Sequence, residues 1–204
     1  MKIICIGRNY DAHIKELQNE TPEDPIIFLK PDTARLTDNK DFILPPWSDD
    51  MHYELELILK IGKNGKFIPE KFAYKYISAY SVGIDFTARD VQSKLKAKGL
   101  PWELSKAFDN SAVTGTWIEV NDGNDLPDNI EFCLKINNEL KQLGKTANMI
   151  YSWPKIIEFI SQYFTLRQGD IIYTGTPQGV GKIHSGDKLA GYIEEKELFN
   201  FLVK

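Results

Sequence analysis

The chain has 204 residues, of which 42% are hydrophobic and 26% charged, and its formal net charge is −4 at pH 7. This length and hydrophobic content suffice for a buried core and favour one domain over residues 1–204. Because acidic and basic residues are mixed along the chain and no apolar run reaches the length of a membrane span, we expect no nucleic acid partner, no membrane partner and a cytoplasmic protein.

The first predicted elements are a short buried strand over residues 2–7 and a helix over residues 11–18. In this helix His13 and Glu16 stand three positions apart, on one face, so that the carboxylate can hold an imidazole nitrogen. Such a pair is commonly used to activate a water molecule. An exposed short helix with an incidental histidine is the alternative. Residues 21–25 are rich in turn formers and can let a short segment move as a lid.

A buried strand over residues 26–30 is followed by a longer one over residues 52–63, in which acidic and leucine positions alternate. Because side chains alternate between the two faces of a strand, Glu54 and Glu56 point the same way. They lie roughly 7 Å apart along the strand. Both carboxylates can therefore bind one hard divalent cation such as Mg²⁺ or Mn²⁺. A solvated outer face, with the leucines turned inward, is the alternative.

An apolar run over residues 77–84 ends at Asp85, which supplies a third carboxylate. Directly after it, Thr87 and Asp90 fit a capping box in its aspartate form. This motif predicts a helix from there to about Lys98.

Arg89 and Gln92 lie on one face of this predicted helix, near its N-terminus. A guanidinium, an amide and a helix N-terminus close together suit an anionic ligand. Lys106 follows in a segment with few other charges, and the local sequence leaves open whether its side chain snorkels at the surface.

Most of the remaining predicted elements are strands. They are a strand at residues 112–120, a hairpin of strands 130–136 and 139–143, a helix at 149–164, a strand at 171–174 and final strands at 188–192 and 198–203. We interpret the hairpin as scaffold. The glycine-rich turn at 175–181 lets backbone amides approach a ligand, or is a plain tight turn, but no Gly-Lys-Ser/Thr follows it and it is not a phosphate loop.

Six motifs occur in the order and at the spacing of one known family. They are Gly7-Arg8-Asn9-Tyr10 with His13 and Glu16, Phe28-Leu29-Lys30-Pro31, His52-Tyr53-Glu54-Leu55-Glu56, Asp85-Phe86-Thr87-Ala88-Arg89-Asp90-Val91-Gln92, Gly99-Leu100-Pro101-Trp102 with Lys106, and Gly175-Thr176-Pro177-Gln178-Gly179. In these motifs the chain resembles the fumarylacetoacetate hydrolase family over about residues 3–190. It is most similar to the short members, the acylpyruvases and oxaloacetate decarboxylases, which consist of the catalytic domain alone.

The resemblance implies an α+β, mostly β fold, a mixed β-sandwich roll that forms a homodimer. It implies a single catalytic domain over residues 1–204, with a lid segment at about residues 8–25. The implied site has Mg²⁺ or Mn²⁺ held by Glu54, Glu56 and Asp85, a water-activating pair of His13 and Glu16, Lys106 polarising the substrate, and Lys30, Arg89, Gln92 and Thr176 binding it. Tyr53 stands where the family often has histidine, which is expected to alter metal affinity if that position tunes the ligands.

The activity implied by the resemblance is hydrolysis of the carbon–carbon bond of short acylpyruvates (2,4-diketo acids) to pyruvate and a carboxylic acid, with decarboxylation of oxaloacetate by the same residues. The substrate is then a small 2-oxo acid. One alternative is an isomerase or tautomerase of oxaloacetate or of a 2-hydroxy-dienoate such as 2-hydroxyhepta-2,4-diene-1,7-dioate. Another is a non-catalytic metal-binding scaffold.

Overall fold

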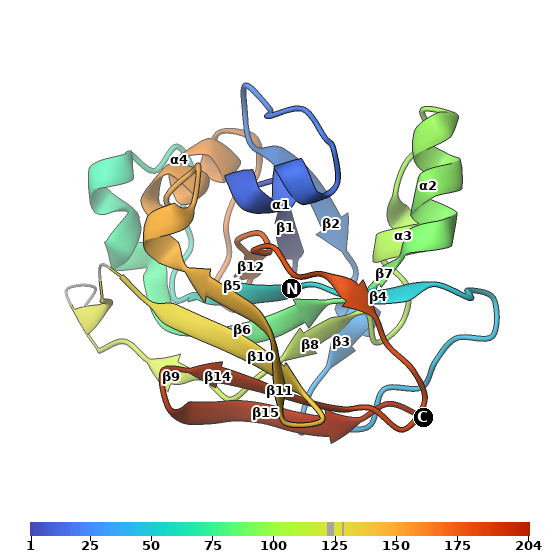
Figure 1. The fold of residues 1–204 in the computed structure, drawn as a ribbon. Coiled ribbons are helices and arrows are strands. Elements are labelled where there is room, and N and C mark those ends of the chain that lie inside the picture. Colours follow the sequence, from blue (N-terminus) through green and yellow to red (C-terminus); the bar gives the residue numbers. More distant parts are fainter. Residues whose placement is uncertain (122–124, 128) are drawn as a thin grey trace.

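The chain is built around a mixed sheet, the middle layer of Figure 1. We describe it from a computed structural model, over residues 1–121, 125–127 and 129–204. Across this central sheet the described strands run in the order β2 (Ile26–Lys30), β1 (Ile3–Gly7), β12 (Ile171–Tyr173), β5 (Leu55–Ile61), β6 (Ile77–Asp85), β8 (Ala112–Thr114) and β3 (Arg35–Leu36), with β9 (Ile118–Glu119) also paired to β6. The single strand predicted at residues 112–120 is thus two strands, β8 and β9.

Strand β5 lies in the middle of this sheet, and both of its faces are buried. Leu57 and Leu59 belong to the main hydrophobic core, whereas Ile58 belongs to a smaller cluster. Since neighbours alternate between faces, the two clusters lie on opposite sides of the sheet, and Glu56 shares the side of Ile58. The long strand predicted over residues 52–63 is interrupted at Glu54, where the chain changes sheets.

A four-stranded antiparallel sheet covers the leucine side of the central sheet (Figure 1). Its strands are, in order, β11 (Glu139–Lys145), β10 (Glu131–Ile136), β14 (Lys188–Ile193) and β15 (Lys196–Leu202). The predicted hairpin is confirmed, and its turn residues Asn137 and Asn138 both have positive φ, 52° and 67°. Such a two-residue turn matches the twist of the paired strands. The main core lies between the two sheets.

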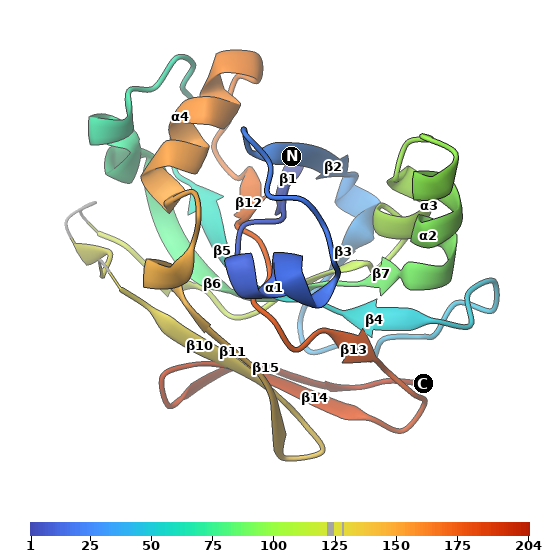
Figure 2. The same ribbon diagram turned by 45° about the horizontal axis from the view of Figure 1, so that its top comes forward.

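The helices lie away from the four-stranded sheet (Figures 1 and 2). The described α-helices are α1 (Asp11–Glu16), α2 (Arg89–Ala97), α3 (Glu103–Lys106) and α4 (Trp153–Tyr163), and the described 3-10 turns are η1 (Asp32–Ala34), η2 (Glu70–Tyr76) and η4 (Thr146–Asn148). A small third sheet of β13 (Gly181–Lys182), β4 (Met51–Tyr53) and β7 (Thr87–Ala88) lies beside α2 and α3.

The capping box predicted for α2 is wrong. Thr87 belongs to β7, where it pairs with His52, and α2 begins only at Arg89. The Asp90 carboxylate accepts hydrogen bonds from the Ser48 hydroxyl at 2.7 Å, the Val91 amide at 2.9 Å and the Asp49 amide at 3.3 Å, rather than from the Thr87 amide as a capping box requires. Tertiary pairing therefore overrides the local capping signal.

Helix α4 starts at Trp153, later than the predicted residue 149. Met149 instead forms an isolated bridge with Tyr10, and Ser152 has extended backbone angles directly before the helix. A proline in the first turn fixes the start of the helix at this point.

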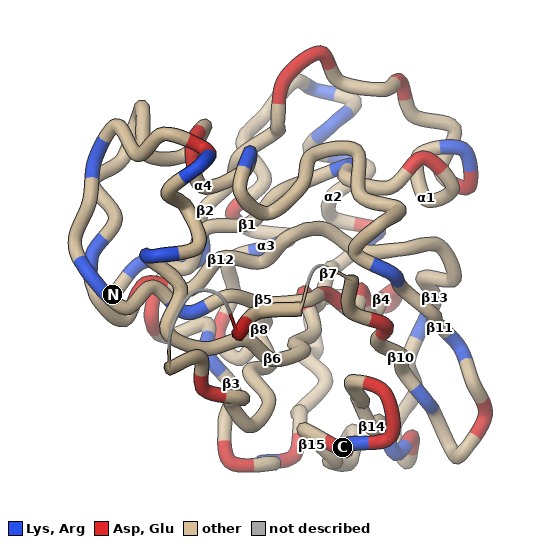
Figure 3. Tube along the Cα trace, turned by 90° about the vertical axis from the view of Figure 1, so that its left-hand side faces the viewer, with Lys and Arg blue, Asp and Glu red and all other residues tan. Residues whose placement is uncertain are grey.

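The predicted α+β, mostly β class is confirmed by this arrangement of curled sheets with few helices. Acidic and basic positions are interspersed along the trace (Figure 3). No helix in the described part of the chain is both long and apolar enough to cross a membrane.

Candidate metal and active site

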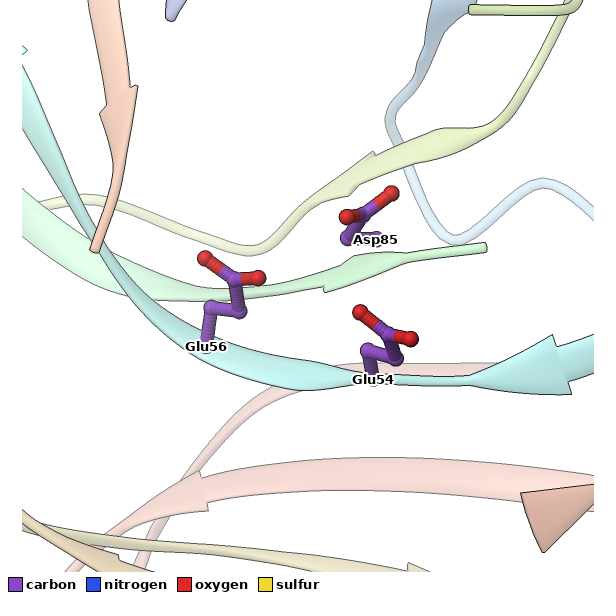
Figure 4. Close-up of side chains that lie close together, drawn as sticks. All are labelled: Glu54, Glu56 and Asp85. Carbon is purple, nitrogen blue, oxygen red and sulfur yellow. The ribbon is translucent and has the colours of Figure 1, made fainter. Parts of the chain in front are cut away.

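Three carboxylates converge where the start of β5 lies beside the end of β6 (Figure 4). Glu54 lies at the break between β4 and β5, Glu56 lies within β5, and Asp85 is the last residue of β6. The register brings them together because the Asp85 amide donates to the Glu54 carbonyl at 2.8 Å. Each residue offers an oxygen, and these oxygens lie within 4.8 Å of one another.

The alternative of a solvated outer face is wrong for these glutamates. Glu54, Glu56 and Asp85 are only 5%, 2% and 1% exposed. A buried carboxylate needs a hydrogen bond, an ion pair or a metal to offset its lost hydration. The contacts of each carboxylate therefore show what the site can hold.

Two buried lysines contact the carboxylates. The Lys106 ammonium lies 2.8 Å from Glu54 Oε2 and 2.6 Å from Asp85 Oδ2, and it donates to the Thr87 hydroxyl at 2.6 Å. Lys106 is 3% exposed, so the snorkelling alternative is wrong. The Lys30 ammonium lies 2.7 Å from Asp85 Oδ1. Lys30 also donates to the Lys106 carbonyl, which ties the two cations together.

Arg89 is the third cation of the site. Its guanidinium lies 2.5 Å from Glu54 Oε1 and donates to Gln92 Oε1 at 2.7 Å. Both residues lie in the first turn of α2, on the face predicted from the sequence. Burial alone raises the pKa of the Glu54 carboxyl, but Lys106 and Arg89 outweigh it, so the pKa lies well below its usual range.

Glu56 differs from the other two carboxylates because it has no cationic partner among the described residues. Its Oε2 accepts one hydrogen bond, 2.6 Å long, from the Gly175 amide. Burial and the neighbouring Asp85 raise the pKa of the Glu56 carboxyl well above its usual value. The glycine-rich turn therefore brings a backbone amide to a carboxylate of the site, as close-approach glycines allow.

The pair of His13 and Glu16 forms as predicted. His13 Nδ1 lies 3.2 Å from Glu16 Oε2 on α1, and His13 is 5% exposed, so the alternative of an incidental surface histidine is wrong. Glu16 also accepts a hydrogen bond, 3.0 Å long, from the Gly179 amide. The glycine-rich turn thus contacts both the carboxylate cluster and the pair on α1.

One cleft connects these groups. Nearly every residue predicted for the site lines it, namely His13, Glu54, Glu56, Asp85, Arg89, Gln92, Lys106 and Thr176. Glu16 and Lys30 contact the site from behind this lining, through His13 and Asp85. The side chains of Phe28, Trp102 and Leu17 give part of the cleft an apolar wall.

Gln142 is the residue that sequence reasoning missed, since its hairpin was interpreted as scaffold. Gln142 is 1% exposed. Its Oε1 accepts a hydrogen bond from the Leu55 amide at 2.8 Å. Its Nε2 donates to Thr176 Oγ1 and to the Pro177 carbonyl, both at 2.9 Å. A register shift in the β10–β11 pairing leaves Lys141 unpaired beside it, and such a bulge re-aims a side chain. A bulge cannot be read from strand alternation, so the sequence carried no clear signal.

Tyr53 does not contact the carboxylates. It belongs to the main hydrophobic core, and strand alternation places it on the face opposite Glu54. Its hydroxyl lies against Gly181, where an added Cβ would come within 2.9 Å.

Comparison with known proteins identifies the family of this chain. Residues 2–199 match the family described as fumarylacetoacetate (FAA) hydrolase C-terminal. The mouse protein named oxaloacetate tautomerase FAHD1, mitochondrial, is 41% identical over 202 residues, which cover 99% of this chain and 91% of the mouse protein.

Two solved structures show how widely this fold is used. Fumarylpyruvate hydrolase from Pseudomonas aeruginosa, in complex with Mn²⁺ and pyruvate, superposes with a TM-score of 0.93 at 33% identity and covers 100% of this chain and 89% of that chain. The 5-carboxymethyl-2-hydroxymuconate delta-isomerase from Mycobacterium smegmatis superposes with a TM-score of 0.85 at 35% identity and covers 99% of this chain and 77% of that chain. Hydrolase and isomerase names therefore both occur among its structural neighbours.

Proposed function

This chain belongs to the fumarylacetoacetate hydrolase family, and from that membership we propose that it is a divalent-metal-dependent enzyme that hydrolyses short acylpyruvates to pyruvate and a carboxylic acid. The proposal includes decarboxylation of oxaloacetate by the same residues, in a single catalytic domain over residues 1–204. The observation that carries it is the His13–Glu16 pair, which lies in the same cleft as a buried cluster of three carboxylates.

The residues fit a hard divalent cation. Glu54, Glu56 and Asp85 offer oxygen ligands, which Mg²⁺ and Mn²⁺ prefer. An ionised Glu56 would be a buried charge that one backbone amide does not offset, and a bound cation would offset it. We therefore assign these three residues as ligands of Mg²⁺ or Mn²⁺. When bound, such a cation would chelate the carboxylate and 2-oxo oxygen of a 2-oxo acid and stabilise the negative charge that develops as the bond at C3 breaks.

The cations of the protein bind and orient the substrate in this proposal. Arg89 supplies a planar guanidinium and Gln92 an amide, which suit a substrate carboxylate. Lys106 adds positive charge where the oxyanion grows, while Lys30 holds Asp85 and the Lys106 backbone in place. Thr176 contributes a hydroxyl to the cleft wall.

The pair on α1 moves the proton of the attacking water. With its Nδ1 proton held by Glu16, His13 can accept a proton from water at Nε2. The resulting hydroxide adds to the distal carbonyl, the carbon–carbon bond breaks, and the pyruvate enolate takes up the proton at C3. Water is thereby divided between the two products, with OH on the acid and H on pyruvate.

A second function, tautomerisation of oxaloacetate, is favoured by the name of the mouse relative at 41% identity. Movement of a proton between C3 and the enol oxygen needs the same charge stabilisation but no attack by water. His13 can then serve as the base alone.

Turnover of purified protein, stripped of metal and reloaded with Mg²⁺ or Mn²⁺, tests these functions. Acetylpyruvate, fumarylpyruvate and oxaloacetate are supplied in parallel, while pyruvate release and enol absorbance are followed. Metal-dependent release of pyruvate from a diketo acid supports hydrolysis. Enol–keto exchange of oxaloacetate without pyruvate release replaces hydrolysis by tautomerisation, and no reaction with any substrate supports the metal-binding scaffold.

Two further parts of the proposal concern assembly and location. We propose a homodimer, to be checked by light scattering of the eluting protein. We also propose a cytoplasmic location, and cell fractionation distinguishes it from the mitochondrial location in the name of the mouse relative.

A further inference from the structure

A basic surface lies outside the cleft, on residues 63–76. Its lysines are Lys63, Lys66, Lys71 and Lys75, and Glu70 is its one acidic residue, so its formal charge is +3 in a chain of net charge −4. The segment includes η2, which packs beside α4 at the left of Figure 1. Figure 3, which faces this side, shows several basic positions near α4 and the N-terminus. None of these residues lines the cleft, so the proposed function leaves the basic surface unexplained.

The lysines of this surface have no acidic partner in the described part of the chain. Their ammonium groups lie over aromatic rings instead, Lys63 at 4.5 Å from the ring centre of Tyr76, Lys66 at 5.0 Å from that of Phe67, and Lys71 and Lys75 at 5.0 Å and 5.4 Å from that of Phe72. Glu158 and Asp170, which line neighbouring hollows, are already paired with Lys155 and Lys2. The surface therefore carries positive charge that the protein does not neutralise.

Phe67 projects from this surface and is 69% exposed. Its φ of 51° lies in the left-handed region, which bulky side chains rarely adopt. Two hydrogen bonds hold this backbone against α4, because the Phe67 amide donates to the Ser161 carbonyl at 3.0 Å and the Ile68 amide to Ser161 Oγ at 2.8 Å. Ile68 itself is buried, and the exposed Tyr163 lines the same hollow as Phe67. The fold thus fixes an aromatic ring in solvent, among unpaired lysines.

Exposed aromatic rings among lysines suit an anionic lipid surface. Such rings enter the zone between headgroups and acyl chains, while the long lysine stems let the ammonium groups reach lipid phosphates. Single-stranded nucleic acid suits the surface less, because its bases stack on open ring faces. Here Lys66 lies over Phe67, and two ammonium groups lie over Phe72.

We propose that residues 63–76, together with Tyr163, dock the protein on membranes that contain anionic lipids. Phe67 enters the interface, and the four lysines bind lipid phosphates. The sequence predicts no membrane partner because no segment is long enough to span a bilayer, but contact with its surface needs no such segment. Since none of these residues lines the cleft, docking leaves the lining of the active site unchanged.

Sedimentation with lipid vesicles at low ionic strength tests the docking surface. Wild type should bind vesicles of equal parts phosphatidylcholine and phosphatidylglycerol but not vesicles of phosphatidylcholine alone, and binding should weaken as NaCl is raised, since salt screens surface charges. Each Lys→Gln change at the four lysines should weaken binding about fivefold, and the quadruple variant should abolish it. Phe67→Asn should weaken binding by about tenfold, because asparagine accepts the left-handed backbone but buries no ring.

Matched controls lie at exposed positions outside the basic surface. Leu140→Asn removes an exposed apolar side chain from β11, and Lys94→Gln an exposed lysine from α2, and both should bind vesicles like wild type. Absence of binding to the anionic vesicles, equal binding to both kinds of vesicle, or an equal loss in the controls overturns the proposal. Binding of oligo-dT or polyglutamate in place of the vesicles overturns it too, and assigns the surface to nucleic acid or to an acidic protein. Turnover should be the same in all of these variants, so the result does not depend on the proposed function.

Discussion

The two sides of the cleft are held in very different ways. The sheet side, with Glu54, Glu56 and Asp85, stands on paired strands, and its charged side chains have several buried partners. The other side is the predicted lid segment, where the six-residue helix α1 carries His13.

Few side-chain contacts join that segment to the rest of the chain. Glu16 accepts from the Gly179 amide, the Tyr151 hydroxyl donates to the Pro22 carbonyl at 2.8 Å, and Lys96 contacts Asn19. Before α1, the side chain of Asn9 is fixed by hydrogen bonds to Thr174 and Tyr151. This contrast supports the proposal that residues 8–25 act as a lid over the preformed charged side of the cleft, as expected when a site must admit substrate and then exclude water.

The largest effect is expected on the sheet side. Glu56→Ala removes one of the three proposed metal ligands from a buried position, so we expect activity to fall at least about a thousandfold. The variant should also lose the rise in Tm that wild type shows with excess Mn²⁺. Differential scanning fluorimetry with and without Mn²⁺, combined with turnover, measures both.

Glu195→Ala, at an exposed turn, is the matched control and should behave as wild type. A Glu56→Ala protein that still gains Tm with Mn²⁺ would contradict the ligand assignment. Metal-dependent stabilisation of wild type without turnover would instead favour a scaffold.

On the lid side, His13→Ala and Glu16→Gln are expected to lower kcat for acylpyruvate hydrolysis by about 10²- to 10⁴-fold, the range of general acid–base catalysis. Decarboxylation of oxaloacetate should persist, because it needs no attacking water, and stabilisation by Mn²⁺ should persist, because neither residue is a proposed metal ligand. His184→Ala, at an exposed histidine, is the control. An equal loss of both activities would mean that His13 and Glu16 maintain the structure of the cleft and do not activate water.

A substitution at Gln142 measures how much its buried hydrogen bonds stabilise the sheet side of the cleft. Gln142→Leu leaves the buried Leu55 amide without its acceptor and removes both contacts to the 176–177 turn, so we expect a loss of about 3 kcal/mol in the free energy of unfolding. Urea denaturation measures this loss, and the KM for acylpyruvate should rise as Thr176 shifts. Lys141→Gln, its exposed neighbour, should change stability by less than about 0.5 kcal/mol. A similarly small change for Gln142→Leu would show that the stability of the sheet side of the cleft does not depend on Gln142.

The smallest expected effect is on how the stability of the metal-free protein depends on pH. Because the pKa of Glu56 is raised in the folded, metal-free protein, the folded state binds more protons than the unfolded state above the usual carboxyl pKa. Stability of metal-free wild type should therefore fall as pH rises through this window, whereas Glu56→Gln lacks that contribution. Urea midpoints from about pH 5 to pH 8 should show a growing advantage of Glu56→Gln without metal. With Mn²⁺ the advantage should disappear, since wild type then binds the cation.

The sequence located much of the candidate site because the required information is local. Strand alternation placed Glu54 and Glu56 on one face, the end of an apolar run marked Asp85, and helical spacing paired His13 with Glu16 and Arg89 with Gln92. The roles of these residues came from the family resemblance and remain proposals. Local signals were misleading at Thr87, because pairing with His52 drew it into a strand.

Only the tertiary structure decided which side chains are buried and which distant ones meet. Lys30 reaches the Lys106 carbonyl across 76 positions, and Gln142 reaches Leu55 across 87. These contacts depend on the order of strands in the sheets and on a bulge, neither of which local propensity encodes. The sequence by itself thus determined which residues could do chemistry, whereas packing of the sheets decided that Lys106 is buried against the carboxylates.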